Sequence, residues 1–201
     1  MKKTLIINIV FIYNRLKSRI GRSMIVLSGA SASGKTEAAK MLMAKYGIAR
    51  AITTTTRQKR NREVDGRDYF FVSKEKFEQM IKEGAFIEHT IYNGNYYGST
   101  KNQIADNRSL VIDLEGLKTY SQSKDKRIVT FFLSSSEELC FKRMIDRGDD
   151  EEEAKRRIDN DRKIFATNCI PKVDYIIDSE HKTIEEVADE VYALYMEHIK
   201  H

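Results

Sequence analysis

A glycine-rich octapeptide between an apolar run and a helical pattern constrains this chain more than any other feature. It spans residues 29–36 and reads Gly-Ala-Ser-Ala-Ser-Gly-Lys-Thr, after the apolar run 24–27 and before a helical pattern at 37–46. Glycines let the backbone curl so that its N–H groups point into one concavity, and the positive end of the following helix favours anions there. The order strand, loop, helix therefore predicts a phosphate-binding loop, against the alternative of a glycine turn in an unrelated α/β protein.

Each position of this loop has an expected role in holding a nucleoside triphosphate. The Lys35 ammonium can reach the β- and γ-phosphates, and the Thr36 hydroxyl can ligate Mg²⁺. The remaining positions offer backbone N–H groups to phosphate oxygens. The predicted triphosphate-binding residues are Gly29, Ala30, Ser31, Ala32, Ser33, Gly34, Lys35 and Thr36.

The composition fits a single enzyme-sized domain. The chain has 201 residues, 41% of them hydrophobic, which is enough for one α/β domain with insertions. The net charge of +5 suits an anionic partner, but the excess is spread along the chain and does not by itself indicate nucleic acid. Cys140 and Cys169 form no C-x-x-C pair. We therefore expect no zinc site or disulfide framework, and a cytoplasmic location.

Residues 1–23 form an N-terminal arm of unknown role. The apolar stretch 5–13 is interrupted by Asn8 and followed by four basic residues, with no small-residue cleavage site. It is too short to span a bilayer and does not match a signal peptide. Its apolar residues fall near helical spacing, so we expect a basic amphipathic arm. The alternatives are a non-functional extension from an upstream start codon and attachment to a membrane surface, although no membrane partner is expected.

The rest of the chain predicts a parallel sheet with an insertion. Apolar runs at 24–27, 109–114, 127–133 and 173–178 are separated by helical segments, including 137–146 and 183–200. This pattern is typical of a sheet covered by helices on both faces. Residues 53–107 read differently, with a threonine strand near 51–56, a strand at 69–72, a helix from Ser73 through Lys82, and a hairpin turning at Asn93-Gly94. We expect these residues to form a small, mostly β unit.

Several motifs, in the family's order, resemble guanylate kinases, which transfer a phosphoryl group from ATP to GMP. They lie at 29–36, 54–60, 63–72, 86–88, 94–99 and 147–148, within a resemblance that covers residues 24 to about 195. The resemblance implies an α/β P-loop NTPase three-layer fold with a core at 24–52, 108–142 and 164–201. It also implies a GMP-binding region at 53–107, a helical lid at 143–163, ATP as donor, Mg²⁺ as cofactor, and a monomer or homodimer.

The residues of the insertion suit an acceptor nucleotide. Arg57 and Arg60, three positions apart, can form a guanidinium fork on its phosphate. The Glu88 carboxylate only accepts hydrogen bonds, and guanine presents N1–H and its 2-amino group side by side, whereas adenine lacks that pair. The resemblance adds a group of hydroxyl and carboxyl side chains that would contact GMP: Thr53, Tyr69, Tyr97, Ser99 and Asp113.

The resemblance also implies how the phosphoryl group is moved. Arg147 and Arg157 resemble the family's lid arginines, and would act with Lys35 as the catalytic groups, Arg147 also contacting ATP. The simpler interpretations are a solvated charged face for the arginines and a helix cap for Asp113. Arg57 and Arg60 could also belong to a solvated loop, the two tyrosines to the core, and Glu88 to the surface.

The chain departs from the family at three places, one of which is the unusual segment 168–172. The segment Asp113-Leu-Glu115-Gly is shorter than the family's motif, which puts the role of Glu115 in doubt, and Asp178 stands where an asparagine near the adenine is usual. Two alternative functions follow. A kinase for another nucleoside monophosphate has no evident use for Glu88. A non-catalytic guanylate-kinase-like module that binds proteins typically lacks an intact phosphate loop, which this chain retains.

Overall fold

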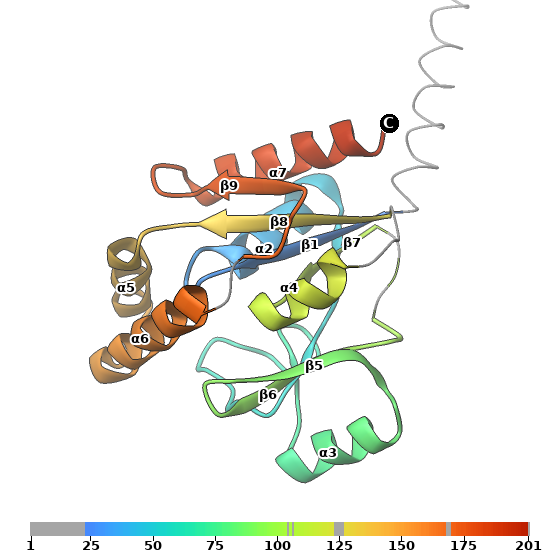
Figure 1. Cartoon of the computed structure of the whole chain (residues 1–201), viewed down its shortest axis with the longest axis vertical. Helices are drawn as coiled ribbons and strands as arrows, with labels where there is room; N and C mark the ends of the chain where they lie inside the picture. Colours follow the sequence, from blue (N-terminus) through green and yellow to red (C-terminus); the bar gives the residue numbers. More distant parts are fainter. Residues whose placement is uncertain (1–22, 104, 106, 123–126, 168–169, 201) are drawn as a thin grey trace, which may run out of the picture.

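The computed structural model describes residues 23–200, except 104, 106, 123–126 and 168–169 (Figure 1). The predicted N-terminal arm therefore lies outside the described residues, apart from Ser23. Its expected amphipathic helix stays a prediction.

A five-stranded parallel sheet forms the centre of the molecule, in the order β2-β7-β1-β8-β9. The strands are β1 Met24–Gly29, β2 Ala49–Arg50, β7 Arg108–Val111, β8 Ile128–Ser134 and β9 Tyr175–Asp178. Every neighbouring pair is parallel, and β1 lies between β7 and β8, with Ile25 opposite Ser109 and Val129. The predicted parallel sheet is confirmed. Because β1 is central and leads into the phosphate loop, the loop lies at the carboxyl edge of the sheet.

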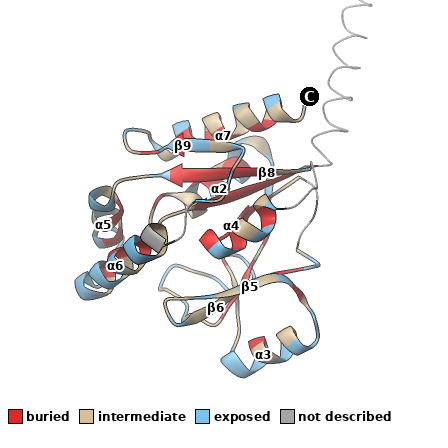
Figure 2. Cartoon of the chain, in the orientation of Figure 1, coloured by how far each residue is buried: buried red, intermediate tan, exposed pale blue. Residues whose placement is uncertain are grey.

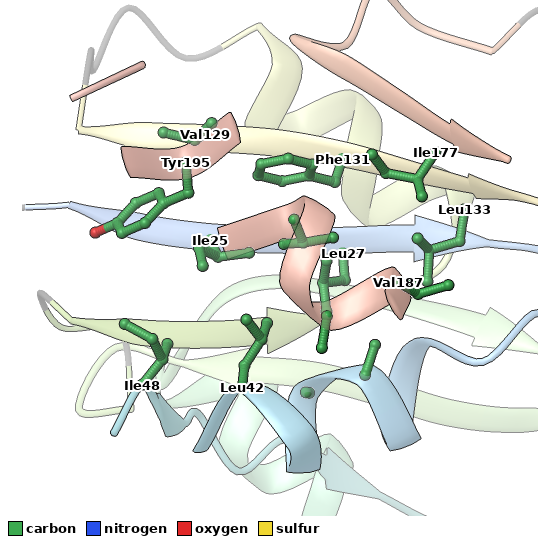
Figure 3. Packing of buried hydrophobic residues seen from close by; sticks show 14 residues of the cluster. Ile25, Leu27, Leu42, Ile48, Val129, Phe131, Leu133, Ile177, Val187 and Tyr195 are labelled. Atoms are coloured by element: carbon green, nitrogen blue, oxygen red, sulfur yellow. The ribbon is translucent and has the colours of Figure 1, made fainter. Parts of the chain in front are cut away.

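Helices cover both faces of this sheet, as the apolar runs predict. On one face, α2 (Lys35–Tyr46) and α7 (Ile184–His198) pack on Ile25, Leu27 and Phe131, which are fully buried (Figure 3). On the other face, α4 (Leu114–Ser121) packs on Val26 and Leu110. Figure 2 shows the central strands as the most deeply buried part of the chain. Burial of this kind contributes about 25 cal/mol per Å² of apolar surface, so the sheet anchors the loop firmly.

Two helix ends follow directly from the sequence. Gly47 adopts a left-handed conformation with φ 69°, and its N–H bonds back to the carbonyls of Leu42 and Met43, which ends α2. Thr183 caps α7 in a capping box with Glu186. The predicted closing helix at 183–200 is confirmed.

Four strands between Thr54 and Thr100 form a separate small sheet in the order β4-β3-β6-β5. Its strands are β3 Thr54–Thr55, β4 Phe70–Phe71, β5 Phe86–Tyr92 and β6 Asn95–Thr100, and α3 (Lys74–Lys82) is capped by the Ser73 hydroxyl. The predicted hairpin is confirmed, because Asn93 and Gly94 both have positive φ and β5 pairs antiparallel with β6. The threonine strand is shorter than predicted: only Thr54 and Thr55 pair, and the edge strand β2 before it was not predicted.

The charged segment that follows the central strands forms two helices. α5 (Glu137–Asp146) ends at a turn in which Gly148 has φ 89°, and α6 (Glu151–Thr167) follows. Figure 1 shows this pair projecting beside the carboxyl edge of the central sheet. The expected lid boundaries at 143 and 163 both fall inside continuous helices. Each helix thus extends past the expected boundary into residues that were assigned to the core. The lid at 143–163 stays a proposal.

Candidate active site

A cavity of about 660 Å³ separates the phosphate loop from the small sheet. Residues from the loop, from β5 and β6, from α4 and from α6 line it, so the central sheet's loop edge, the small sheet and the α5–α6 pair all contribute. Of the predicted site residues, the following line the cavity: Gly29, Ser31, Ala32, Gly34, Lys35, Thr36, Thr53, Arg60, Tyr69, Glu88, Tyr97, Asp113, Arg147 and Arg157. Ala30, Ser33, Arg57 and Ser99 are not among its lining residues.

The backbone of the loop requires its two glycines. Gly29 has φ 148°, and a Cβ there would stand 2.4 Å from the Leu133 carbonyl oxygen. Gly34 has φ 101° and forms the N-cap of α2. Between them Ala32 adopts φ 60°, which costs a residue with a side chain about 1–2 kcal/mol. The curled, partly strained loop is the shape that the sequence predicts for a phosphate cradle.

Lys35 is the first residue of α2, and its side chain folds over the loop. Its ammonium group donates to the carbonyl oxygens of Gly29 at 2.9 Å and Ala30 at 2.6 Å. Burial, which removes the ammonium from water, lowers the pKa of Lys35 to about 8, although the charge of Asp161 opposes this shift. The cavity is thus equipped with a cation that an incoming phosphate would stabilise.

Glu88 projects from β5 into the cavity opposite the loop. Its Oε1 accepts a hydrogen bond of 2.6 Å from the hydroxyl of Ser99 on β6. Burial raises the pKa of Glu88, and the Ser99 hydrogen bond partly offsets this rise. Ser99 is itself fully buried, so it acts on the cavity through Glu88. Thr53, also buried, adds a side chain to the same lining.

Asp113 forms the helix cap that was weighed from the sequence, and it also faces the cavity, so its contact with GMP stays a prediction. Its Oδ1 accepts from the Gly116 N–H at 2.8 Å and so caps α4, and the residue also lines the cavity. Burial raises the pKa of Asp113 despite this hydrogen bond. Gly116 lies against both carboxylates: a Cβ there would stand 3.3 Å from Glu88 Oε2 and 3.4 Å from Asp113 Oδ1. The absence of a side chain at Gly116 thus leaves room for this acidic pair.

Arg57 and Arg60, which were expected to form a fork on phosphate, both contact the carboxylate of Glu63. Arg57 donates to Glu63 at 2.8 and 3.0 Å, and its guanidinium lies 5.3 Å from the Tyr69 ring centroid. The same carboxylate accepts from the Arg60 backbone N–H at 2.9 Å. Only Arg60 lines the cavity. Glu63 therefore holds Arg57 beside the site in this structure.

Tyr69 and Tyr97 meet between the loop 57–63 and the hairpin. Their ring centroids are 6.2 Å apart in an edge-on arrangement, and both rings line the cavity. Burial raises the pKa of Tyr69, so its hydroxyl stays protonated and can donate. Neither ring lies in the main hydrophobic clusters, which disfavours the simpler interpretation of the two tyrosines as core residues.

A carboxylate joins the two predicted lid arginines. Asp149 pairs with Arg147 and, at 3.2 Å, with Arg157. Arg60 lines the same cavity, and burial together with the charges of Arg57, Arg147 and Arg157 lowers the pKa of Arg60. Arg60, Arg147 and Arg157 thus all face the cavity, where cations can neutralise a phosphoryl group.

Comparison with known proteins places this arrangement in a family. The family model described as guanylate kinase matches residues 21–197. The chain belongs to the guanylate kinase family. It is 34% identical over 176 residues to a guanylate kinase of Wolbachia pipientis, covering 82% of this chain and 87% of that protein. It is 32% identical over 173 residues to one of Clostridium tetani, covering 82% of each.

Solved structures agree with this family membership. The crystal structure of guanylate kinase from Anaplasma phagocytophilum aligns with a TM-score of 0.60 at 25% identity, covering 86% of this chain and 84% of that one. A shikimate kinase from Acinetobacter baumannii aligns with a TM-score of 0.51 at 14% identity, covering 90% and 97%. The second likeness shows only the shared P-loop α/β fold, which confirms the predicted fold class.

Other residues of this guanylate kinase family member were not singled out from the sequence. Arg143 on α5 lines the cavity and donates to the carbonyls of Ala32 and Ser179 at 3.4 and 3.2 Å. Glu63 and Asp149 pair with Arg57, Arg147 and Arg157. In the sequence, the only indication of these pairs is that each acid lies within eight residues of its arginines.

Asp178, which departs from the family's usual asparagine, is exposed. It accepts from the Glu180 N–H and is not among the cavity-lining residues.

Proposed function

We propose that this chain transfers the γ-phosphoryl group of Mg-ATP to GMP, and to dGMP, giving ADP and the guanosine diphosphate. One observation carries the proposal: a single cavity has the phosphate loop on one side and Glu88 with its hydroxyl neighbours on the other. A donor and an acceptor can therefore lie end to end between them. Family membership supports the same activity.

The acceptor half is suited to guanine. An ionised Glu88 can accept from both N1–H and the 2-amino group, and the Ser99 hydroxyl fixes the orientation of its carboxylate. Adenine would leave this partly buried carboxylate without donors, which is costly. Arg60, Tyr69 and Tyr97 line the same cavity and would hold the acceptor phosphate, with Arg57 joining them when it leaves Glu63.

The donor half is the loop with Lys35 and Thr36. The loop N–H groups and the Lys35 ammonium would hold the triphosphate, and Arg147 would contact it from the lid. Within the described residues no group of three or more His, Cys, Asp or Glu side chains could hold a metal by itself. Mg²⁺ commonly binds through substrate phosphates with few protein ligands, and the Thr36 hydroxyl in the cavity fits that role. Bound Mg²⁺ would neutralise phosphate charge.

The transfer needs positioning and charge neutralisation from the protein. Arg157, Arg147 and Lys35 converge on the cavity from different elements. Asp149 holds the two lid arginines together until the phosphates replace it as their partner. Closure of the lid would also exclude water, which otherwise competes with GMP for the phosphoryl group.

Product analysis tests this proposal. The full chain is incubated with ATP, MgCl₂ and GMP, and the nucleotides are separated by chromatography. We expect ADP and GDP in equal amounts, and little ADP when GMP is left out. Formation of ADP without GDP would overturn the proposal, because the chain would then be hydrolysing ATP. Absence of any reaction would favour the non-catalytic module, which the comparisons do not favour.

A further inference from the structure

Three hydrogen bonds join the phosphate loop, the small sheet and the lid helix at one point. Asp161 on α6 accepts from the backbone N–H of Ser31 at 2.6 Å. The Tyr92 hydroxyl, at the end of β5, donates to the other oxygen of the same carboxylate. The hydroxyls of Ser31 and Tyr92 are 2.7 Å apart. We call this group, Ser31 with Tyr92 and Asp161, the clasp.

Ser31 and Asp161 of the clasp are buried and Tyr92 is partly buried, and neither Asp161 nor Tyr92 has a part in the reaction described above. Asp161 is 6% exposed and Ser31 7%, and all three residues line the cavity. Burial and the Asp161 charge raise the pKa of Tyr92, so its hydroxyl stays protonated and keeps its proton for the carboxylate. The loop N–H and the phenol both donate to this deeply buried carboxylate and stabilise it.

The position of Asp161 conflicts with a bound triphosphate. Its carboxylate takes a backbone N–H of the loop that is expected to hold phosphates. Its charge attracts the Lys35 ammonium, which donates to loop carbonyls in this structure. A phosphate arriving at this end of the cavity meets a negative charge and an N–H that is already paired.

We propose that Asp161, held by Tyr92, is a built-in competitor for the donor phosphates. In the empty site the clasp ties α6 and β5 to the loop, and ATP binds by displacing the carboxylate from Ser31. Part of the binding energy of ATP is therefore used to open the clasp, and removing the Asp161 charge makes ATP bind more tightly. This inference rests on the proposed function, since it requires ATP at the loop.

Titration calorimetry of ATP into the full chain, without GMP, tests the clasp. The variant is Asp161→Asn, which keeps the shape of the side chain and removes its charge. The matched control is Asp159→Asn on the same helix, because Asp159 is exposed and pairs with Arg162 at 3.0 Å outside the cavity. We expect Asp161→Asn to bind ATP about five-fold or more tightly than the wild type, and Asp159→Asn to match the wild type.

A second variant and a second ligand guard against a merely structural effect. Tyr92→Phe removes a donor to Asp161 and keeps its charge, and we expect it to bind ATP about two-fold more tightly. It replaces Asp161→Asn as the test if that variant does not fold. Adenosine, which has no phosphate, should bind all variants equally.

The outcomes separate this inference from the proposed function. Equal or weaker ATP binding by Asp161→Asn, or the same gain for adenosine as for ATP, would overturn the clasp and leave the kinase assignment standing. A wild type that does not bind ATP at all would overturn both.

Discussion

Glu88 Oε1 and the Ser99 hydroxyl oxygen are 2.6 Å apart across the β5–β6 hairpin, and Glu88 lines the cavity together with the phosphate loop. The hydrogen bond favours the ionised carboxylate, while burial and the Asp113 charge oppose it and raise the pKa of Glu88 above its usual 4.5. The proposed recognition of guanine by Glu88 would thus depend on a carboxylate that gains its proton at a higher pH than an exposed one.

This pKa predicts an acid limb in the use of GMP. Protonated Glu88 cannot accept from both guanine donors, so kcat/KM for GMP should fall as the pH drops through the raised pKa. The measurement is a pH profile from 4.5 to 8 for the wild type, divided by that of Glu88→Gln to remove the ionisation of the GMP phosphate. A ratio that does not change with pH would contradict the role of the Glu88 charge.

Lys35 should take up a proton when ATP binds. Its pKa of about 8 leaves about half of the empty sites uncharged at pH 8, and the phosphates favour the charged form. Calorimetry in buffers of different ionisation enthalpy should give uptake of up to about half a proton at pH 8 and none from this group at pH 6.5. Lys35→Met should bind ATP without this uptake and lose turnover. Equal uptake by Lys35→Met would show that another group titrates.

Arg157 should act mainly in the transfer step. Its guanidinium lines the cavity and is held by Asp149 at 3.2 Å, so it can follow the charge that develops on the phosphoryl group. We expect Arg157→Ala to lower kcat by about 10²–10³-fold with a smaller change in KM. Arg156→Ala is the matched control, because Arg156 pairs with Glu153 and does not line the cavity. A loss confined to KM would place Arg157 in ground-state binding instead.

Gly116→Ala should damage the acceptor site while leaving the fold intact. The added Cβ would stand 3.1 Å from Ile112 Cβ, 3.3 Å from Glu88 Oε2 and 3.4 Å from Asp113 Oδ1, although alanine favours the helix by up to about 1 kcal/mol. We expect the KM for GMP to rise several-fold with the KM for ATP unchanged. Thr119→Ala, an exposed position of the same helix, should change neither. Equal KM values for GMP in both variants would mean that the two carboxylates shift without cost.

The sequence predicts local features of the fold well because they depend on short-range chemistry. The loop, the Asn93-Gly94 hairpin and the helix that begins at Ser73 each follow from a few adjacent residues. The run of threonines predicts too long a strand, because only Thr54 and Thr55 pair with neighbouring strands. β-propensity by itself does not decide pairing.

The pairing of site charges was the part that the sequence could not give. Arg57 has the right spacing for a phosphate fork, yet Glu63 occupies it in this structure. Asp161 and Tyr92 are 69 residues apart, and nothing in the sequence near either of them indicates their contact. Such pairs are fixed by the packing of α6 against the loop and the hairpin, which depends on the whole chain.

The choice of acceptor tests the central claim most directly. In a coupled assay of ADP release with Mg-ATP, GMP, dGMP, AMP, UMP and CMP are offered separately to the wild type and to Glu88→Gln. We predict turnover with GMP and dGMP, little with the others, and a kcat/KM for GMP about 10–100-fold lower in Glu88→Gln. Turnover of AMP in preference to GMP, or equal rates of the two proteins with GMP, would contradict this account.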